Sequence, residues 1–120
     1  MTIDTVQYVV DLTIDDGKVE AFERIAQAMS AGCQKEPGAL EYSWYLNGDR
    51  KRCRLIEIYA DANAVVAHLT GPVVSELVPK LLKVSKLTGF EVYGDPGPKA
   101  SEMLAGFGAQ VFGPWHGFSR

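Results

Sequence analysis

Apolar and polar residues alternate over two stretches of the chain, which is the pattern of half-buried strands. The clearest is Thr5–Ile14, where every second residue is apolar. Ala39–Asn47 has the same period, and Asn47-Gly48-Asp49 at its end favours a tight turn with positive φ angles, so Arg52–Tyr59 is the expected partner strand. Thr88–Tyr93 is rich in β-branched and aromatic residues and predicts a fourth strand. We therefore expect four strands, of which the middle two form an antiparallel hairpin.

The region between the first two strands repeats its apolar residues at intervals of three and four, as an amphipathic helix does. This pattern runs from Val19 to Cys33. Asp15 or Asp16 is the expected N-cap, because a short carboxylate accepts from free N–H groups of the first turn. Glu36-Pro37-Gly38 ends the helix, since proline disfavours helical geometry in the residue before it.

A second helical pattern follows Asp61, which is the expected N-cap of that helix. The pattern is interrupted at Gly71-Pro72 and resumes from Val74 to Leu82. Pro79 lies inside the resumed part, where it removes a backbone donor and crowds the preceding turn. We therefore expect a kink or a break near Pro79.

The chain from Gly94 onward exceeds what four strands and two helices require. Ala100–Phe107 has helical spacing, and Ala109–Phe112 has the character of a strand. Leaving a large apolar side chain in water costs about 1.5–3 kcal/mol, and this segment carries Met103, Leu104, Phe107, Val111, Phe112, Trp115 and Phe118. We therefore expect residues 1–94 to form one domain, and residues 95–120 to form a helix and a strand that dock on it or on a partner subunit, with Trp115 as an anchor.

The order strand, helix, strand, strand, helix, strand predicts an α+β fold of the ferredoxin-like βαββαβ type, with an antiparallel sheet and both helices on one face. The other face then presents apolar residues such as Val9, Ile56 and Ile58. Because a patch of this kind is unfavourable in water, a second copy of the chain is expected to cover it. The sequence predicts a homodimer.

Composition narrows the range of partners. The chain has 120 residues, of which 47% are hydrophobic and 22% charged, so it is typical of one globular domain. Its net charge of −3 is too small and of the wrong sign to bind a nucleic-acid backbone. Met1-Thr2-Ile3-Asp4 does not resemble a secretory signal, and no apolar run is long enough to span a membrane, so a cytoplasmic protein is expected.

Motifs for the common enzyme classes are not found. The chain has no glycine-rich phosphate loop and no nucleophile elbow. Cys33 and Cys53 have no partner at metal-binding spacing, so neither a zinc site nor a disulfide framework is expected. The notable feature is a group of aromatic residues in the central hairpin, close in sequence to Glu57 and followed by His68.

Three stretches resemble the antibiotic biosynthesis monooxygenase superfamily of dimeric α/β barrels: Glu36-Pro37-Gly38-Ala39-Leu40-Glu41-Tyr42, Glu57-Ile58-Tyr59-Ala60-Asp61 and Ala67-His68-Leu69. The shared pattern is a Pro-Gly before the second strand, a Glu-x-aromatic at the end of the third and an Ala-x-His early in the second helix. The resemblance covers roughly residues 5 to 94 and implies a dimeric barrel. Its members include cofactor-independent oxygenases, haem-degrading enzymes, isomerases and proteins with no known activity.

The haem-degrading branch is disfavoured, because its members resemble one another at positions where this chain differs. They place Asn on the first strand, Trp at the end of the third and an iron-binding His beyond the second-helix His. This chain has Gln7 and Tyr59 at the first two positions and no His from Leu69 to Lys86.

The oxygenase branch implies a base that removes a proton from an electron-rich phenol, whose anion then reduces dioxygen without a cofactor. An imidazole changes protonation near neutral pH, so His68 is the expected base, and Glu57 and Tyr59 complete the expected catalytic group. Tyr42 and Trp44 are the expected walls of the binding site for a small aromatic substrate.

Structural interpretations of the same residues stay open. Glu57 can serve only to hold the fold, and Trp44 and the tyrosines can belong to the core or to the dimer interface. The alternative function is therefore a non-catalytic, stress-related dimeric barrel that binds a small apolar ligand.

Overall fold

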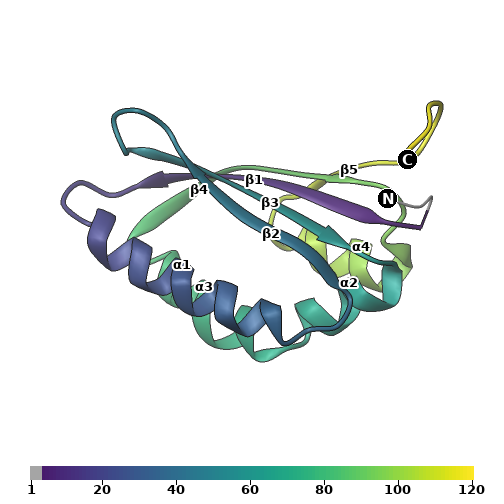
Figure 1. The fold of residues 1–120 in the computed structure, drawn as a ribbon, viewed down its shortest axis with the longest axis horizontal. Coiled ribbons are helices and arrows are strands. Elements are labelled where there is room, and N and C mark those ends of the chain that lie inside the picture. Colours follow the sequence, from purple (N-terminus) through teal and green to yellow (C-terminus); the bar gives the residue numbers. More distant parts are fainter. Residues whose placement is uncertain (1–3) are drawn as a thin grey trace.

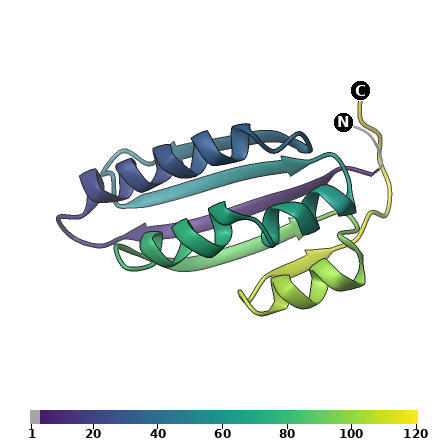
Figure 2. The same ribbon diagram turned by 90° about the horizontal axis from the view of Figure 1, so that it is seen from below.

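The computed structural model describes residues 4–120 as one sheet with helices packed on one of its faces (Figures 1 and 2). The strand order is β2-β3-β1-β4-β5. The strands are β1 Val6–Ile14, β2 Ala39–Leu46, β3 Arg52–Tyr59, β4 Ser85–Tyr93 and β5 Gln110–Phe112. The helices are α1 Val19–Gln34, α2 Ala62–Leu69, a π-helical turn η1 Val73–Leu77, α3 Val78–Leu81 and α4 Gly97–Ala105. The predicted ferredoxin-like α+β fold, with an added short helix and strand, is confirmed.

The central strand β1 pairs antiparallel with β3 on one side and with β4 on the other. Its alternation places Val6, Tyr8, Val10, Leu12 and Ile14 in the core, each at most 7% exposed. In this register Tyr8 lies opposite Glu57 on β3, and Glu57 in turn lies opposite Tyr42 on β2. Tyr8, Glu57 and Tyr42, three residues with ionisable side chains, therefore form a row across the sheet.

Two local predictions for the first half of the chain are wrong. No side chain caps α1, because Gly17, at a φ of 74°, turns the chain between the aspartates and the helix, whose N-cap is Lys18. In the hairpin the residue with positive φ is Arg50, at 61°, instead of Gly48. The Asn47 side chain accepts hydrogen bonds from the backbone N–H groups of Lys51 and Arg52, so a longer loop replaces the tight turn.

The second helical region follows its prediction more closely. Asp61 caps α2 by accepting from the Ala64 N–H at 2.9 Å. After a break at Thr70–Pro72 the chain forms η1, and α3 begins where the ring of Pro79 is tolerated, in the first turn of a new helix. The expected break is therefore present, displaced to the start of α3.

The C-terminal extension has two contrasting parts. α4 is docked through Ala100 and Leu104, both fully buried, and β5 adds to the sheet parallel to β4 (Figure 2). Beyond β5, however, Trp115 is 88% exposed and Phe118 is 79% exposed. Trp115 is therefore not an anchor within its own chain, because its ring contacts the neighbouring His116 but remains largely open to solvent.

The structure also bears on the expectations about membranes and leaders. Within residues 4–120 no helix has the length and apolar character needed to cross a membrane. The first three residues, on which the expectation about a secretory signal depends, lie outside the described residues.

Candidate functional site

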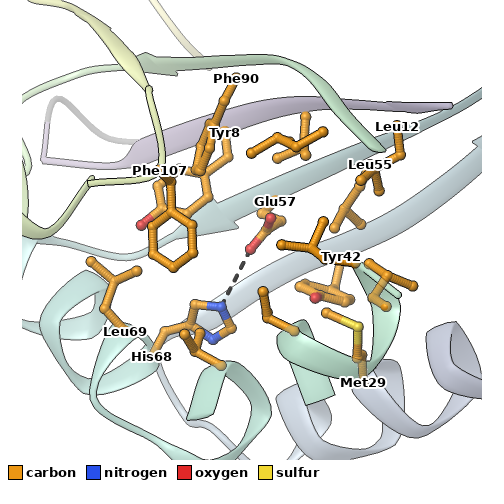
Figure 3. Close-up of a pocket in the computed structure, with 16 residues that line it drawn as sticks. Tyr8, Leu12, Met29, Tyr42, Leu55, Glu57, His68, Leu69, Phe90 and Phe107 are labelled. Carbon is orange, nitrogen blue, oxygen red and sulfur yellow. Dashed lines mark ion pairs between the residues drawn. The ribbon is translucent and has the colours of Figure 1, made fainter. Parts of the chain in front are cut away.

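A small cavity lies between the inner face of the sheet and the helices (Figure 3). Its volume is about 70 Å³. The walls are almost wholly apolar, and Glu57 and His68 bring ionisable groups to it. The lining residues are Tyr8, Val10, Leu12, Met29, Tyr42, Leu55, Glu57, His68, Leu69, Val74, Val78, Leu81, Leu82, Leu87, Phe90 and Phe107.

His68 reaches the cavity from α2, where the Asp61 cap sets the first turn and Val65 and Leu69 bury the same helix face. The imidazole is itself buried, with 5% of the side chain exposed. Its Nδ1 lies 3.0 Å from Oε1 and 3.3 Å from Oε2 of Glu36, and its Nε2 lies 3.5 Å from Oε1 of Glu57. The ring is therefore held between two carboxylates, one on each nitrogen.

Glu57 comes from the inner face of β3 and is only 5% exposed. Burial raises the pKa of its carboxyl group, because a charge is poorly solvated in the core; His68 and a hydrogen bond from Tyr59 oppose this shift. The Tyr59 hydroxyl donates to Glu57 Oε1 at 2.5 Å. Glu57 is thus a buried acid with partners on two sides, as a buried carboxyl group requires.

Tyr59 and Tyr42 flank this pair in different ways. Tyr59 is fully buried behind Glu57, and its ring centroid is 5.0 Å from that of His68, but it does not line the cavity. Tyr42 does line the cavity, with its ring centroid 6.2 Å from that of His68. The structure therefore brings Glu57, Tyr59, His68 and Tyr42 together.

Trp44 does not line the cavity, although its ring meets that of Tyr42 edge-to-face at 5.7 Å. Its indole Nε1 donates to Ser30 Oγ on α1 at 2.8 Å, and its ring meets Phe22 edge-to-face at 5.8 Å. Although Trp44 is on the same strand face as Tyr42, it is two residues further along β2 and is covered by α1. The expected role of Trp44 as a substrate wall therefore does not agree with its position.

Three polar residues of the site were not predicted from the sequence. Glu36 follows α1 and meets His68, while Cys33 Sγ lies 3.7 Å from His68 Nδ1. Tyr8 lines the cavity, and its buried hydroxyl has no hydrogen-bond partner among the described residues. Burial, and then the charge of Glu57, raises the Tyr8 pKa far above its ordinary value. The only sequence signal for Glu36 was its place in the Glu-Pro-Gly motif.

Gly38 sets how closely these elements approach. A Cβ atom at Gly38 would lie 2.4 Å from the Cβ of Ala64, so only glycine allows the start of β2 to pass this close to α2. Ala64 lies one turn before His68 on α2. The contact therefore determines how close α2, which carries His68, lies to the segment that carries Glu36.

Comparison with known proteins adds the following. A family model described as "Antibiotic biosynthesis monooxygenase" matches residues 6–80. The fold is similar to that of MupZ from Pseudomonas fluorescens, at 27% identity and a TM-score of 0.83, over 98% of this chain and 95% of that one. The C-terminal extension is therefore largely included in that similarity.

Two further solved structures share the fold at lower identity. One is SnoaB, a cofactor-independent oxygenase from Streptomyces nogalater, at 19% identity and a TM-score of 0.68, over 79% of this chain and 96% of that one. The other is a conserved protein from Methanosarcina mazei Go1, at 17% identity and a TM-score of 0.68, over 76% and 92% of the two chains. No curated protein matches the chain.

Proposed function

Because the chain belongs to the antibiotic biosynthesis monooxygenase family, we propose that it oxidises a hydroquinone- or polyphenol-like aromatic with dioxygen, without a cofactor. The observation that carries this proposal is His68, a buried imidazole between two carboxylates at the wall of an apolar cavity. SnoaB, which shares the fold, is described as a cofactor-independent oxygenase. Family membership and the site thus support the same class of reaction.

His68 is the base in this proposal. With its proton on Nδ1, the ring donates to Glu36 at 3.0 Å and keeps the Nε2 lone pair on the side of Glu57. The 3.5 Å between Nε2 and Glu57 Oε1 is longer than an ordinary hydrogen bond, so a substrate hydroxyl that approaches beside the pair can contact both atoms. Proton transfer to Nε2 then forms an imidazolium between two carboxyl groups, which stabilise its charge.

The electrons come from the substrate itself. A hydroquinone and O₂ give a hydroxyquinone and one water: a ring C–H becomes C–OH, both original hydroxyls become carbonyls, and the second oxygen atom leaves as water. The substrate loses four electrons and O₂ gains four, so no outside reductant is needed. The contribution of the protein is to hold the phenol and to accept its proton, which makes the ring electron-rich enough to react with O₂.

The size of the cavity implies movement on binding. Its 70 Å³ is well below the roughly 150 Å³ of a cavity known to hold benzene. Leu82, which is 39% exposed, and Phe107, on the segment that follows α4, form part of the wall. We expect these two side chains to move aside when a ring enters between α3 and β4.

The homodimer is part of the proposal. On the outer sheet face Val9 and Ile56 are partly exposed, although Ile58, expected beside them, is only 9% exposed. Tyr45, Tyr93 and Phe112 extend this apolar surface at 56%, 38% and 41% exposed. A second copy that covers this face should bury at least ~1,000 Å² in total.

The test is oxygen uptake by the full chain, freed of metal and flavin, with a panel of hydroquinones and anthrones. We expect uptake with at least one substrate, and a loss of about 10²–10⁴-fold in His68→Ala. Uptake that is unchanged in His68→Ala would overturn the role of the base. Saturable binding of these aromatics with no uptake would favour the alternative, a barrel that only binds a small apolar ligand.

A further inference from the structure

We propose that Cys33, Glu36 and His68 form a binding site for a divalent transition-metal ion, with Zn²⁺ as the best match. Cys33 lies near the end of α1, Glu36 follows that helix and His68 lies on α2. One ligand atom from each residue can be chosen so that all three lie within 4.8 Å of one another. Two of the three side chains are buried, and Glu36 is 21% exposed, which gives an ion a route from solvent.

The separations match those around a tetrahedral ion. Zn–S bonds of about 2.3 Å and Zn–N bonds of about 2.0–2.1 Å place neighbouring ligand atoms roughly 3.3–3.6 Å apart. Here Cys33 Sγ is 3.7 Å from His68 Nδ1, which is 3.0 and 3.3 Å from the two Glu36 oxygens. The Glu36 carboxylate is the most exposed of the three groups, so it can adjust most freely to complete the geometry.

The surrounding residues match the outer shell of a metal site, and this is an independent observation. A histidine that binds an ion through one nitrogen usually donates its other N–H to a carboxylate. Nε2 of His68 faces Glu57 at 3.5 Å, slightly beyond hydrogen-bond distance, so a small shift of the ring on metal binding would let Nε2–H donate to Glu57, which Tyr59 holds in place. On the other ligand, a hydrogen bond from Tyr42 stabilises the charged form of the Cys33 thiol.

The donor set determines the type of ion. A thiolate, an imidazole and one carboxylate suit Zn²⁺ or Co²⁺, whereas Mg²⁺ and Ca²⁺ prefer oxygen ligands alone. Binding requires the Cys33 thiol to lose its proton, and burial, followed by Glu36 and Glu57, raises the pKa of this thiol to about 12. Affinity is therefore expected to be lower than at a structural zinc site with several cysteines.

A bound ion would regulate the neighbouring cavity, a consequence that rests on the proposed function. An ion on Nδ1 leaves the ring proton on Nε2, pointing at Glu57. Nε2 then has no free lone pair to accept the proton of a phenol. Zn²⁺ should therefore inhibit oxygen uptake reversibly, and a chelator should restore it.

The direct test is a Co²⁺ titration of the metal-free full chain, monitored by absorption. We expect a near-ultraviolet thiolate-to-cobalt charge-transfer band that Zn²⁺ abolishes by competition. Cys33→Ser should lose the band, and Glu36→Gln should weaken binding at least about tenfold. Cys53→Ser is the matched control, because Cys53 is also a free, buried cysteine but lies outside the cluster. Its band should be unchanged.

The absence of this band in the wild-type chain, or its survival in Cys33→Ser, would overturn the site. If Cys33→Ser does not fold, NMR of the imidazole nitrogens provides a second test, and a His68 Nδ1 resonance that stays unmoved by Zn²⁺ would equally overturn it. The measurements separate the two proposals. Oxygen uptake without metal binding refutes the metal site alone, and metal binding without any uptake supports the site and counts against the proposed function.

Discussion

The two faces of the sheet carry their polar groups in opposite ways. On the inner face Glu57 is buried, and Tyr59 and His68 hold it in one position. On the outer face Arg54 and Asp11 form an ion pair at 2.7 Å, with side chains that are 54% and 26% exposed. An exposed pair contributes about 0–1 kcal/mol, whereas breaking a buried one costs about 3–5 kcal/mol. In the proposed function, the inner face therefore provides the site for chemistry and the outer face provides the dimer interface.

The largest effect is expected on the inner face. His68→Gln retains a planar polar group but cannot accept a proton, so oxygen uptake with the best substrate should fall by about 10²–10⁴-fold. His116→Gln is the matched control, because His116 lies in the exposed C-terminal segment and contacts Trp115. Activity of His68→Gln within tenfold of wild type would contradict a base at this position.

The outer face should respond in assembly instead of chemistry. Ile56→Asp places a charge in the apolar centre of the proposed interface, and loss of a central contact weakens dimerisation by at least ~2 kcal/mol, or roughly 30-fold. Light scattering over a dilution series measures this change. Ala31→Asp, on an exposed position of α1, should leave the mass unchanged. A wild-type chain that is monomeric at micromolar concentration would contradict the interface itself.

A smaller effect is expected from Tyr8, whose buried hydroxyl has no partner among residues 4–120. Tyr8→Phe removes an unsatisfied polar group and should raise the free energy of unfolding by about 1–3 kcal/mol at pH 7, measured by urea denaturation. A destabilised variant would show that the hydroxyl is satisfied in solution.

The same variant sharpens the comparison at alkaline pH. The Tyr8 pKa is raised in the folded chain, so above pH 10 the unfolded chain releases a proton that the folded chain keeps. Stability from this group is complete below pH 10 and is lost as the pH rises further. Wild type should therefore lose stability more steeply than Tyr8→Phe between pH 10 and 11, and parallel curves would contradict the shift.

The smallest effect concerns Trp44. Trp44→Phe loses the hydrogen bond to Ser30, worth about 0.5–1.5 kcal/mol, but does not alter the cavity wall. Oxygen uptake should stay within twofold of wild type. A large loss of activity would support the original prediction that Trp44 forms a wall of the substrate-binding site.

Patterns along the sequence were sufficient for the sheet and for part of the site. The alternation in β1 identified its buried face, and the Asp61 cap fixed where α2 begins. Glu57 and Tyr59 lie on the same strand face, and α2 packs over that face. The alternation along β3 was therefore enough to predict that both residues lie near His68.

What could not be predicted depends on long-range packing. Glu36 and His68 are 32 positions apart, and their contact depends on the close approach of Gly38 to Ala64, which no local pattern encodes. Trp44 lies on the predicted inner face of β2, but it is covered by α1 instead of lining the cavity. The alternation along a strand does not show which helix covers each position. The predicted antiparallel hairpin is present, but its tight turn is not, because the Asn47 side chain accepts from backbone N–H groups and the positive φ lies at Arg50.

The Gly38 contact also indicates where this scaffold can be re-engineered. A methyl group there would wedge α2 away from the start of β2, since its nearest neighbour would be only 2.4 Å away. A library that varies Gly38 and Ala64 together would change the distance between α2 and the start of β2. Every residue that lines the cavity would stay unchanged. Under the proposed function, the substrate range could then be changed from two positions that do not line the cavity.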